Sequence, residues 1–169
     1  MMDPSFHIRR ASADDAEGIA RVLDVVVSER IHSAIDRAWT AKEQRTYLAS
    51  LSSREAFHVA CAGSGTIVGY QSLDLYSTIL PSMAHVGQLG TFLLPHCRGR
   101  GVGRALFIVT RTFARSADYR KLVIQVRASN LAAQHFYKRL GFSECGRLHA
   151  QVILDGGTDD EVMMECFVR

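Results

Sequence analysis

A glycine-rich turn reads Arg98-Gly99-Arg100-Gly101-Val102-Gly103, between an apolar run at residues 84–94 and an amphipathic run at residues 102–113. The apolar run predicts a strand, and the amphipathic run predicts a helix whose core stripe is Leu106, Val109 and Phe113. The first turn of a helix offers free amides and a positive dipole end, and glycine lets an anion approach the backbone closely. The turn therefore favours a site for phosphate or diphosphate, although glycines also serve steric needs in many turns.

Two other phosphate loops do not fit this turn. A dinucleotide fingerprint needs a glycine where the chain has Arg104, and an acidic residue near Val126 and Arg127. A P-loop needs Gly-Lys-Ser or Gly-Lys-Thr, and the sequence contains neither. Three arginines, Arg98, Arg100 and Arg104, remain candidates for contact with a phosphate group.

The sequence on either side of the turn predicts an alternation of strands and helices. Capping boxes at residues 12–15 and 40–43 start two helices after an opening strand at residues 6–10. Hairpin signals stand at Gly63-Ser64-Gly65 and at residues 155–158. The predicted order is strand, two helices, three strands, helix, strand, helix and two strands. We expect an α/β (α+β) fold with a mixed, mostly antiparallel sheet and a right-handed crossover at the turn.

A second motif follows in the next predicted helix and the turn after it. Its residues are Asn130, Ala133, Phe136, Tyr137, Gly141 and Phe142. Read alone, they describe a helix with an Asn cap, an aromatic core contact and a terminating glycine.

Together, the two motifs resemble the GCN5-related N-acetyltransferase (GNAT) superfamily. Its Arg/Gln-x-x-Gly-x-Gly/Ala signature matches Arg98, Gly101 and Gly103, and its Asn-to-Tyr helix ending in Gly-Phe matches the second motif. The resemblance extends over nearly the whole chain and is most specific at residues 84–142. It implies a GNAT fold, with about seven strands and about four helices on both faces of the sheet.

The resemblance also implies a site for acetyl-CoA. Backbone groups of the strand before the turn would contact the acetyl and pantetheine parts, the turn amides would wrap the diphosphate, and Asn130 would bond the pantetheine arm. Tyr137 would face the thioester sulfur as the catalytic acid, a role that suits a phenol with a pKa of about 10. The implied coenzyme-binding residues are Thr91, Phe92, Leu93, Arg98, Gly99, Arg100, Gly101, Val102, Gly103, Arg104, Asn130 and Tyr137. We interpret Gly87 and Gly90 as part of a splayed strand.

The general base is left open. Members of the superfamily often use a glutamate on the strand before the turn, or a relay of water molecules, and here Gln88 stands at a convenient place for that acid. Other candidates are Glu29, His32, Asp74 and His85, and none is assigned.

Three classes of function compete. We expect an N-acetyltransferase that moves an acetyl group from acetyl-CoA to a primary amine of a small molecule or amino acid, by direct attack in a ternary complex. The alternatives are a protein N-terminal or lysine acetyltransferase and a non-catalytic coenzyme-binding module. The acceptor is expected between residues 28–39, residues 76–83 and the hairpin near Asp155. The ending at residues 159–165 resembles that of bacterial members of the superfamily that act on amino acids or related metabolites, and the alternative is that residues 159–161 form a solvated turn.

Composition favours one domain over residues 1–169, because a chain of 169 residues with 47% hydrophobic and 22% charged residues resembles an ordinary globular protein. A net charge of +3 is too weak to indicate nucleic acid as a partner. Four dispersed cysteines without a CxxC pair indicate buried thiols, with no metal site and no disulfide framework. Residues 1–4 show no signal peptide, and no apolar stretch reaches the roughly 20 residues that cross a bilayer. We expect a cytoplasmic protein without a membrane partner, and its oligomeric state, a homodimer included, stays open.

Overall fold

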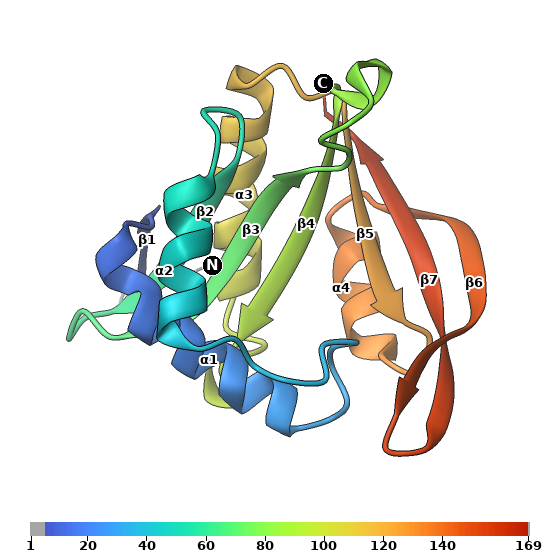
Figure 1. Ribbon diagram of the computed structural model, residues 1–169, viewed down its shortest axis with the longest axis horizontal. Helices are drawn as coiled ribbons and strands as arrows, with labels where there is room; N and C mark the ends of the chain where they lie inside the picture. The colour runs from blue at the N-terminus through green and yellow to red at the C-terminus, as the bar shows by residue number, and fades with distance from the viewer. Residues whose placement is uncertain (1–5, 169) are drawn as a thin grey trace.

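The computed structural model describes residues 6–168, so the predicted absence of a signal peptide at residues 1–4 lies outside the described residues. Three short 3-10 turns, Ala13–Asp15, Pro81–Met83 and Pro95–Cys97, interrupt the longer elements. The elements follow the predicted order (Figure 1). They are β1 (Phe6–Arg10), α1 (Ala16–Ser28), α2 (Ala41–Ser50), β2 (Ala56–Ala62), β3 (Ile67–Leu75), β4 (Val86–Leu93), α3 (Val102–Ser116), β5 (Lys121–Arg127), α4 (Leu131–Arg139), β6 (Ser143–Leu154) and β7 (Gly157–Phe167).

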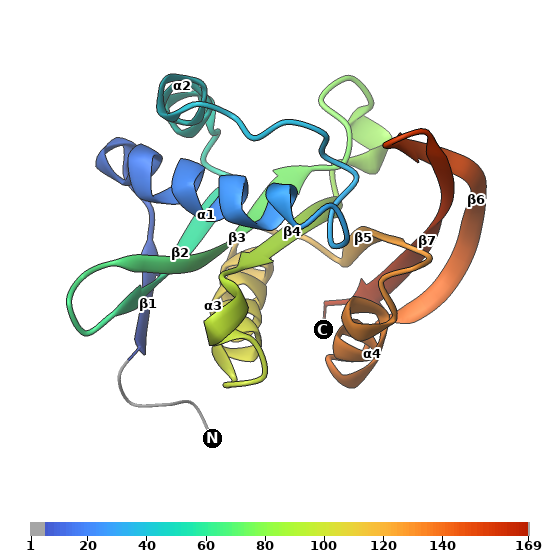
Figure 2. The ribbon, with the colours of Figure 1, turned by 90° about the horizontal axis from the view of Figure 1, so that it is seen from below.

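The strands form one sheet of seven in the order β1-β2-β3-β4-β5-β7-β6. Every neighbouring pair is antiparallel except β4 and β5, which are parallel and joined by α3. Figure 2 shows α1 and α2 over one face of the sheet and α3 and α4 over the other. The predicted mixed sheet with helices on both faces is therefore confirmed.

Strands β4 and β5 pair over only three residues each, Val86–Gln88 with Lys121–Val123, and then diverge (Figure 1). Gly90 lies beyond the paired part, as the predicted splay requires. Gly87 pairs with Leu122 and lies inside the paired part, so the prediction that it belongs to the splay was wrong. A Cβ at Gly87 would approach the side chains of Leu73 to 2.6 Å and Leu122 to 3.1 Å, so this glycine makes room for core packing.

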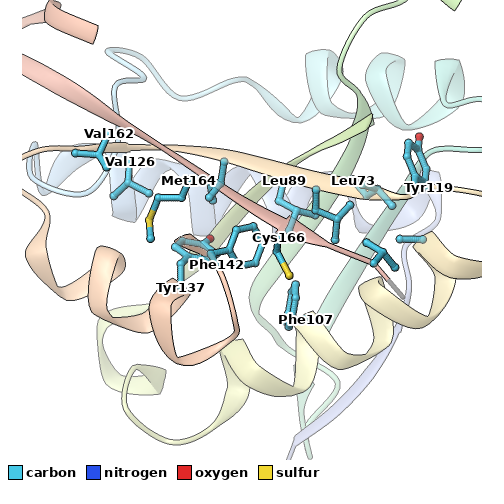
Figure 3. Close-up of a cluster of buried hydrophobic side chains, with 14 residues drawn as sticks. Leu73, Leu89, Phe107, Tyr119, Val126, Tyr137, Phe142, Val162, Met164 and Cys166 are labelled. Atoms are coloured by element: carbon cyan, nitrogen blue, oxygen red, sulfur yellow. The ribbon is translucent and has the colours of Figure 1, made fainter. Parts of the chain in front are cut away.

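The larger core lies between the sheet and the helices α3 and α4 (Figure 3). Leu73, Leu122 and Met164 are fully buried there, and Phe107 is nearly so. The stripe predicted for α3 was correct at Leu106, and Phe113 is partly buried and packs against this core, whereas Val109 is partly buried and belongs to none of the core clusters of residues 6–168. Helix α3 packs on β2 and β3, and its residue Phe107 belongs to the larger core. The buried residues of α3 are Val102, Gly103, Leu106, Phe107, Thr110 and Ala114.

Both predicted capping boxes are present, but only the second one directly starts an α-helix. At α2, the Glu43 amide donates to Thr40 Oγ1 at 3.2 Å and the Thr40 amide donates to the Glu43 carboxylate at 2.6 Å. At the first box, the Ser12 amide donates to Asp15 at 2.7 Å, but the element that it starts is a 3-10 turn. Helix α1 begins one residue later, at Ala16.

Three of the four cysteines are buried, as predicted, and Cys145 is exposed, which corrects the prediction at that position. Cys145 lies on β6, at the end of the sheet farthest from β1. In residues 6–168, none of the helices combines the length and the apolar character that crossing a membrane requires.

The core predicts a large effect at Leu73. Leu73→Ala removes a fully buried side chain and leaves a cavity, so it should lower the free energy of unfolding by about 2–5 kcal/mol in urea titrations. Ile153→Ala is the control, because Ile153 is 73% exposed on β6, and it should change stability little. Equal losses in the two variants would contradict this location of the core.

Candidate functional site

A cavity of about 1070 Å³ occupies the region where β4 and β5 separate. It is lined by both strands, the β4–α3 turn, α4, the segment after α1 and one residue of β7. Most of the predicted site residues lie along it: Thr91, Phe92, Leu93, Arg98, Gly99, Gly101, Gly103, Arg104, Asn130 and Tyr137. Two predicted residues do not line it. Val102 is buried in the core, and the Arg100 guanidinium lies over the Phe6 ring, 5.2 Å from its centre.

The β4–α3 turn presents backbone amides to one end of this cavity. Gly99 and Gly101 have φ of +72° and +83°, a region that favours glycine. The Ala105 amide bonds back to the Gly101 carbonyl at 3.0 Å, whereas the amides before it, in the first turn of α3, have no intrahelical acceptor. Gly103 serves packing, since a Cβ there would lie 3.0 Å from Phe136 of α4. The turn therefore places backbone donors without intrahelical acceptors at the cavity.

The Arg98 side chain is bonded to other residues of this chain. Its guanidinium forms a two-pronged ion pair with Glu29, at the end of α1, and donates to the Leu93 carbonyl at 3.1 Å. Arg98 also lowers the pKa of the Glu29 carboxyl through these hydrogen bonds. Arg98 thus positions the turn against β4 and α1, and Arg104 is the arginine of this motif that lies exposed along the cavity.

Residues 29–36, which we call the bridging segment, connect the two sides of the separated strands. On the β4 side, Glu29 pairs with Arg98. On the β5 side, Arg127 donates to the Arg30 carbonyl at 2.7 Å, and the Arg30 side chain pairs with Asp155 of the β6–β7 turn, also at 2.7 Å. The segment therefore borders the cavity on the α1 side of the sheet, whereas residues 76–83 and Asp155, also predicted near the acceptor, do not line this cavity.

Tyr137 lies in a buried polar chain. Its hydroxyl donates to Thr91 Oγ1 at 2.7 Å, and Gln71 Nε2 donates to the same oxygen at 2.7 Å. Because both lone pairs of the Thr91 oxygen are engaged, its own hydrogen is left as a donor. Burial raises the pKa of Tyr137 well above its ordinary value, so the phenol is protonated at neutral pH.

Asn130 has the capping role that its position predicts. Its side-chain oxygen accepts from the Ala133 amide at 3.1 Å, and its side-chain amide donates to the His32 carbonyl at 3.3 Å. Asn130 is 6% exposed and lines the cavity. It therefore ties α4 to the bridging segment at the place where a pantetheine contact is predicted.

The candidate bases differ in their surroundings. Glu29 is paired, and His85 is exposed and does not line the cavity. His32 lines it, accepts from Arg98 at 2.9 Å, and has a pKa lowered by burial and by that arginine. Burial raises the pKa of Asp74 to about 6, but Asp74 is not part of the lining.

Sequence reasoning missed three residues that the cavity contains or depends on. Arg139 of α4 is an exposed cation on the lining, Gln71 is fully buried behind Thr91, and Glu161 of β7 is 8% exposed on the lining. The acidic run containing Glu161 is a strand and not a solvated turn, which corrects that alternative reading. Alternation along residues 159–164 was the available signal, because Val162 and Met164 point into the core.

The chain matches known proteins over most of its length. A model of the acetyltransferase (GNAT) family matches residues 19–142. The aminoglycoside N(6′)-acetyltransferase type 1 of Stenotrophomonas maltophilia is 32% identical over 96 residues, which cover 55% of this chain and 63% of that protein. The chain thus spans less than two thirds of that relative.

Solved structures share the fold. A GNAT superfamily phosphinothricin acetyltransferase from Sinorhizobium meliloti, in complex with AcCoA, has a TM-score of 0.89 at 18% identity, over 97% of this chain and 89% of that one. The ribosomal-protein-alanine N-acetyltransferase of Brucella melitensis has a TM-score of 0.86 at 22% identity, over 95% and 99% of the two chains. At such identities these likenesses concern the fold.

The ion pair between Glu29 and Arg98 predicts a pH-dependent contribution to stability. The pKa of Glu29 is lower in the folded chain than in the unfolded chain, where it is about 4.3. The ion pair therefore stabilises the folded chain in full when the pH is above the unfolded pKa. This contribution is lost as the pH falls through the lower, folded pKa. Glu29→Gln should therefore unfold more easily than the wild type at neutral pH, with a difference that shrinks below about pH 4. Urea titrations at several pH values measure it, with exposed Glu144→Gln as control. A difference independent of pH would contradict the pairing.

Proposed function

Because this chain belongs to the acetyltransferase (GNAT) family, we propose that it transfers an acetyl group from acetyl-CoA to a primary amine of a small molecule or amino acid. Membership makes the chain an acyl-CoA-dependent N-acyltransferase. The acceptor and the direct attack of its amine within a ternary complex are our proposals. The observation that carries them is one continuous cavity, which extends from the free amides at the start of α3 to the α1 side of the sheet.

The cavity suits the coenzyme in size and chemistry. A volume of about 1070 Å³ is at the upper end of ligand sites, as an extended ligand requires. The amides of the β4–α3 turn offer donors to a diphosphate, and Arg104 and Arg139 add positive charge to the cavity lining. Beyond Gln88, β4 no longer pairs with β5, so its backbone groups are available to the amides of pantetheine as a strand edge is to a peptide.

In this proposal, acetyl-CoA supplies a thioester whose carbonyl carbon is attacked by the amine. Backbone amides near Phe92 and Leu93 are the candidate donors to the developing oxyanion. Tyr137 is the proposed acid for the departing sulfur. Its proton now points to Thr91, and once that proton has left, the Thr91 hydroxyl can rotate and donate its own hydrogen to the phenolate.

A small acceptor fits the α1 side of the cavity best. The bridging segment and the β6–β7 turn are joined by the Arg30–Asp155 pair, and this joint restricts the approach of a large folded target. The aminoglycoside acetyltransferase among the relatives and the phosphinothricin acetyltransferase among the structures act, by their names, on small amines. The second candidate is a peptide N-terminus, in view of the likeness to an enzyme for a protein alanine.

Thiol release tests the proposal. The purified chain is incubated with acetyl-CoA and a panel containing an aminoglycoside with a 6′-amine, phosphinothricin, free amino acids and peptides that begin with alanine. We expect release with at least one small amine and a weaker response to the peptides. Strong release with peptides alone would favour the second candidate. No release with any amine, from folded protein, would refute catalysis of acetyl transfer to amines.

The turn predicts a specific loss at Gly101. Gly101→Ala places a side chain at φ of +83°, which costs about 1–2 kcal/mol and distorts the amides that face the diphosphate. Calorimetry should show weaker CoA binding. Gly65→Ala is the matched control, because Gly65 has the same φ in the β2–β3 turn. The control should lose similar stability and bind CoA normally. Equal affinity in both variants would argue against a role for the turn.

The acid role predicts a loss of rate without a loss of coenzyme affinity. Tyr137→Phe should reduce kcat by roughly 10²- to 10⁴-fold, the usual contribution of general acid catalysis, while CoA binding persists. Tyr119→Phe removes another buried phenol, whose hydroxyl has no partner in the described chain, and it should leave kcat unchanged. Full activity of Tyr137→Phe across neutral and alkaline pH would reduce Tyr137 to a packing residue.

A further inference from the structure

Three consecutive acids on β7 have different surroundings. Asp159 accepts from Arg127 at 2.9 Å and from Ser129 at 2.6 Å. Asp160 accepts from the Ala150 amide at 2.8 Å and lies 3.1 Å from His149. Glu161 has no hydrogen bond or ion pair within residues 6–168, although it is only 8% exposed and lines the cavity. The neighbouring cation, Arg127, is already engaged by Asp159.

The strand geometry sets the face on which Glu161 lies. Val162 and Met164 are fully buried and pack in the same cluster as Tyr137 on the α4 face (Figure 3). Side chains alternate along a strand, so Glu161 belongs to the opposite face, which α1 and α2 cover (Figure 2). Val26 of α1 and Ile35 of the bridging segment line the cavity from that face. Glu161 and Tyr137 therefore approach one cavity from opposite sides of the sheet.

An unpaired carboxylate in such a place is unfavourable for folding. Withdrawal from water penalises its charged form, and burial accordingly raises the pKa of Glu161, with a smaller contribution from Asp159. A cationic ligand would relieve this penalty by supplying the missing partner. Perturbed acids that line a cavity are typical of sites that bind or exchange protons.

We propose that Glu161 binds the ammonium form of the acceptor and accepts a proton from it before the attack on the thioester. This inference rests on the acetyl transfer proposed above and adds a base to it. It also defines the acceptor as a substrate that arrives as a cation, such as an alkylamine with a pKa near the 10.4 of lysine.

The proton and electron balance is complete with the groups named. One ammonium proton passes to a Glu161 oxygen, and the lone pair of the neutral amine forms the C–N bond at the thioester carbonyl. The C–S bond then breaks, and its electron pair leaves with sulfur. Sulfur takes the proton of Tyr137, the amide nitrogen loses its surplus proton and thereby restores the phenol, and the proton on Glu161 passes to solvent. The products are the amide, the free thiol of CoA and one proton.

Other acids and histidines fit this role less well. Glu29 is neutralised by Arg98, and Asp74 lies outside the lining. His32 does line the cavity, but its ring nitrogen accepts a hydrogen bond from Arg98, which opposes the approach of a cation. Glu161 alone among these combines a free carboxylate with a place on the lining.

The test compares Glu161→Gln with the wild type on two nucleophiles. One is the alkylamine that the wild type acetylates best, which is an ammonium ion at neutral pH. The other is an arylamine or hydrazine analogue of that substrate, whose nucleophilic nitrogen is uncharged at neutral pH. Glu161→Gln should lose roughly 10²-fold or more in kcat/KM with the alkylamine and far less with the neutral nucleophile. Glu161→Asp should keep part of the activity. Exposed Glu144→Gln is the control and should behave as the wild type.

Folding and coenzyme binding are monitored by the rise in Tm that CoA produces, which should be the same in Glu161→Gln and the wild type. Wild-type activity of Glu161→Gln on the alkylamine would overturn the role of Glu161 and leave acetyl transfer intact. Equal losses on both nucleophiles would also overturn it, because a neutral amine needs neither ammonium recognition nor a base. A wild-type chain that binds no CoA and acetylates no amine would instead refute the proposed function itself.

Discussion

Strands β4 and β5 bond to each other over three residue pairs and then separate, and the candidate site depends on this separation. Parallel neighbours normally continue their ladder, because unpaired backbone groups that are buried are costly. Here the two strands are held apart by what packs on each side. Helix α3 and the β2–β3 pair support β4, while α4 and β7 support β5. The unpaired edges thus face a cavity where a ligand can satisfy them.

The separation also gives the cavity access to both faces of the sheet. On the α4 face lie Tyr137, the start of α3 and the arginines near it. On the α1 face lie the bridging segment and Glu161. In the proposed function, the coenzyme and the amine enter from opposite faces and meet between the strands without competing for space. Ion pairs at both ends of the bridging segment, Glu29–Arg98 and Arg30–Asp155, join the two halves of the sheet around this meeting point.

Local signals in the sequence predicted the elements and their order because they depend on near neighbours. The Thr40–Glu43 box, the hairpin glycines and the positive φ of Gly101 each reflect contacts within a few residues. The family resemblance then located the β4–α3 turn and α4, and ten of its twelve implied residues line one cavity. Pairings between distant segments could not be predicted in this way. Nothing near Arg98 shows that Glu29, 69 positions away, engages its guanidinium.

The same limit explains Glu161. In the sequence it is one of three consecutive acids in the second strand of a hairpin, and composition makes them look alike. Their different roles arise from tertiary neighbours. Arg127 donates to Asp159, the Ala150 amide donates to Asp160, and Glu161, on the face opposite Val162, lines the cavity. Asn130 illustrates the opposite case, because a local role as a helix cap and a place on the cavity coexist in one side chain.

Hydrogen–deuterium exchange of the backbone amides, with and without CoA, tests whether the coenzyme binds at the β4–α3 turn and along the unpaired part of β4. We expect slower exchange in bound protein at residues 99–104 and at residues 91–93, where the diphosphate and the pantetheine would accept or donate hydrogen bonds. The amides of the β2–β3 turn should be unaffected. If residues 99–104 exchange at their free rate in saturating CoA, the β4–α3 turn is not the site of the diphosphate.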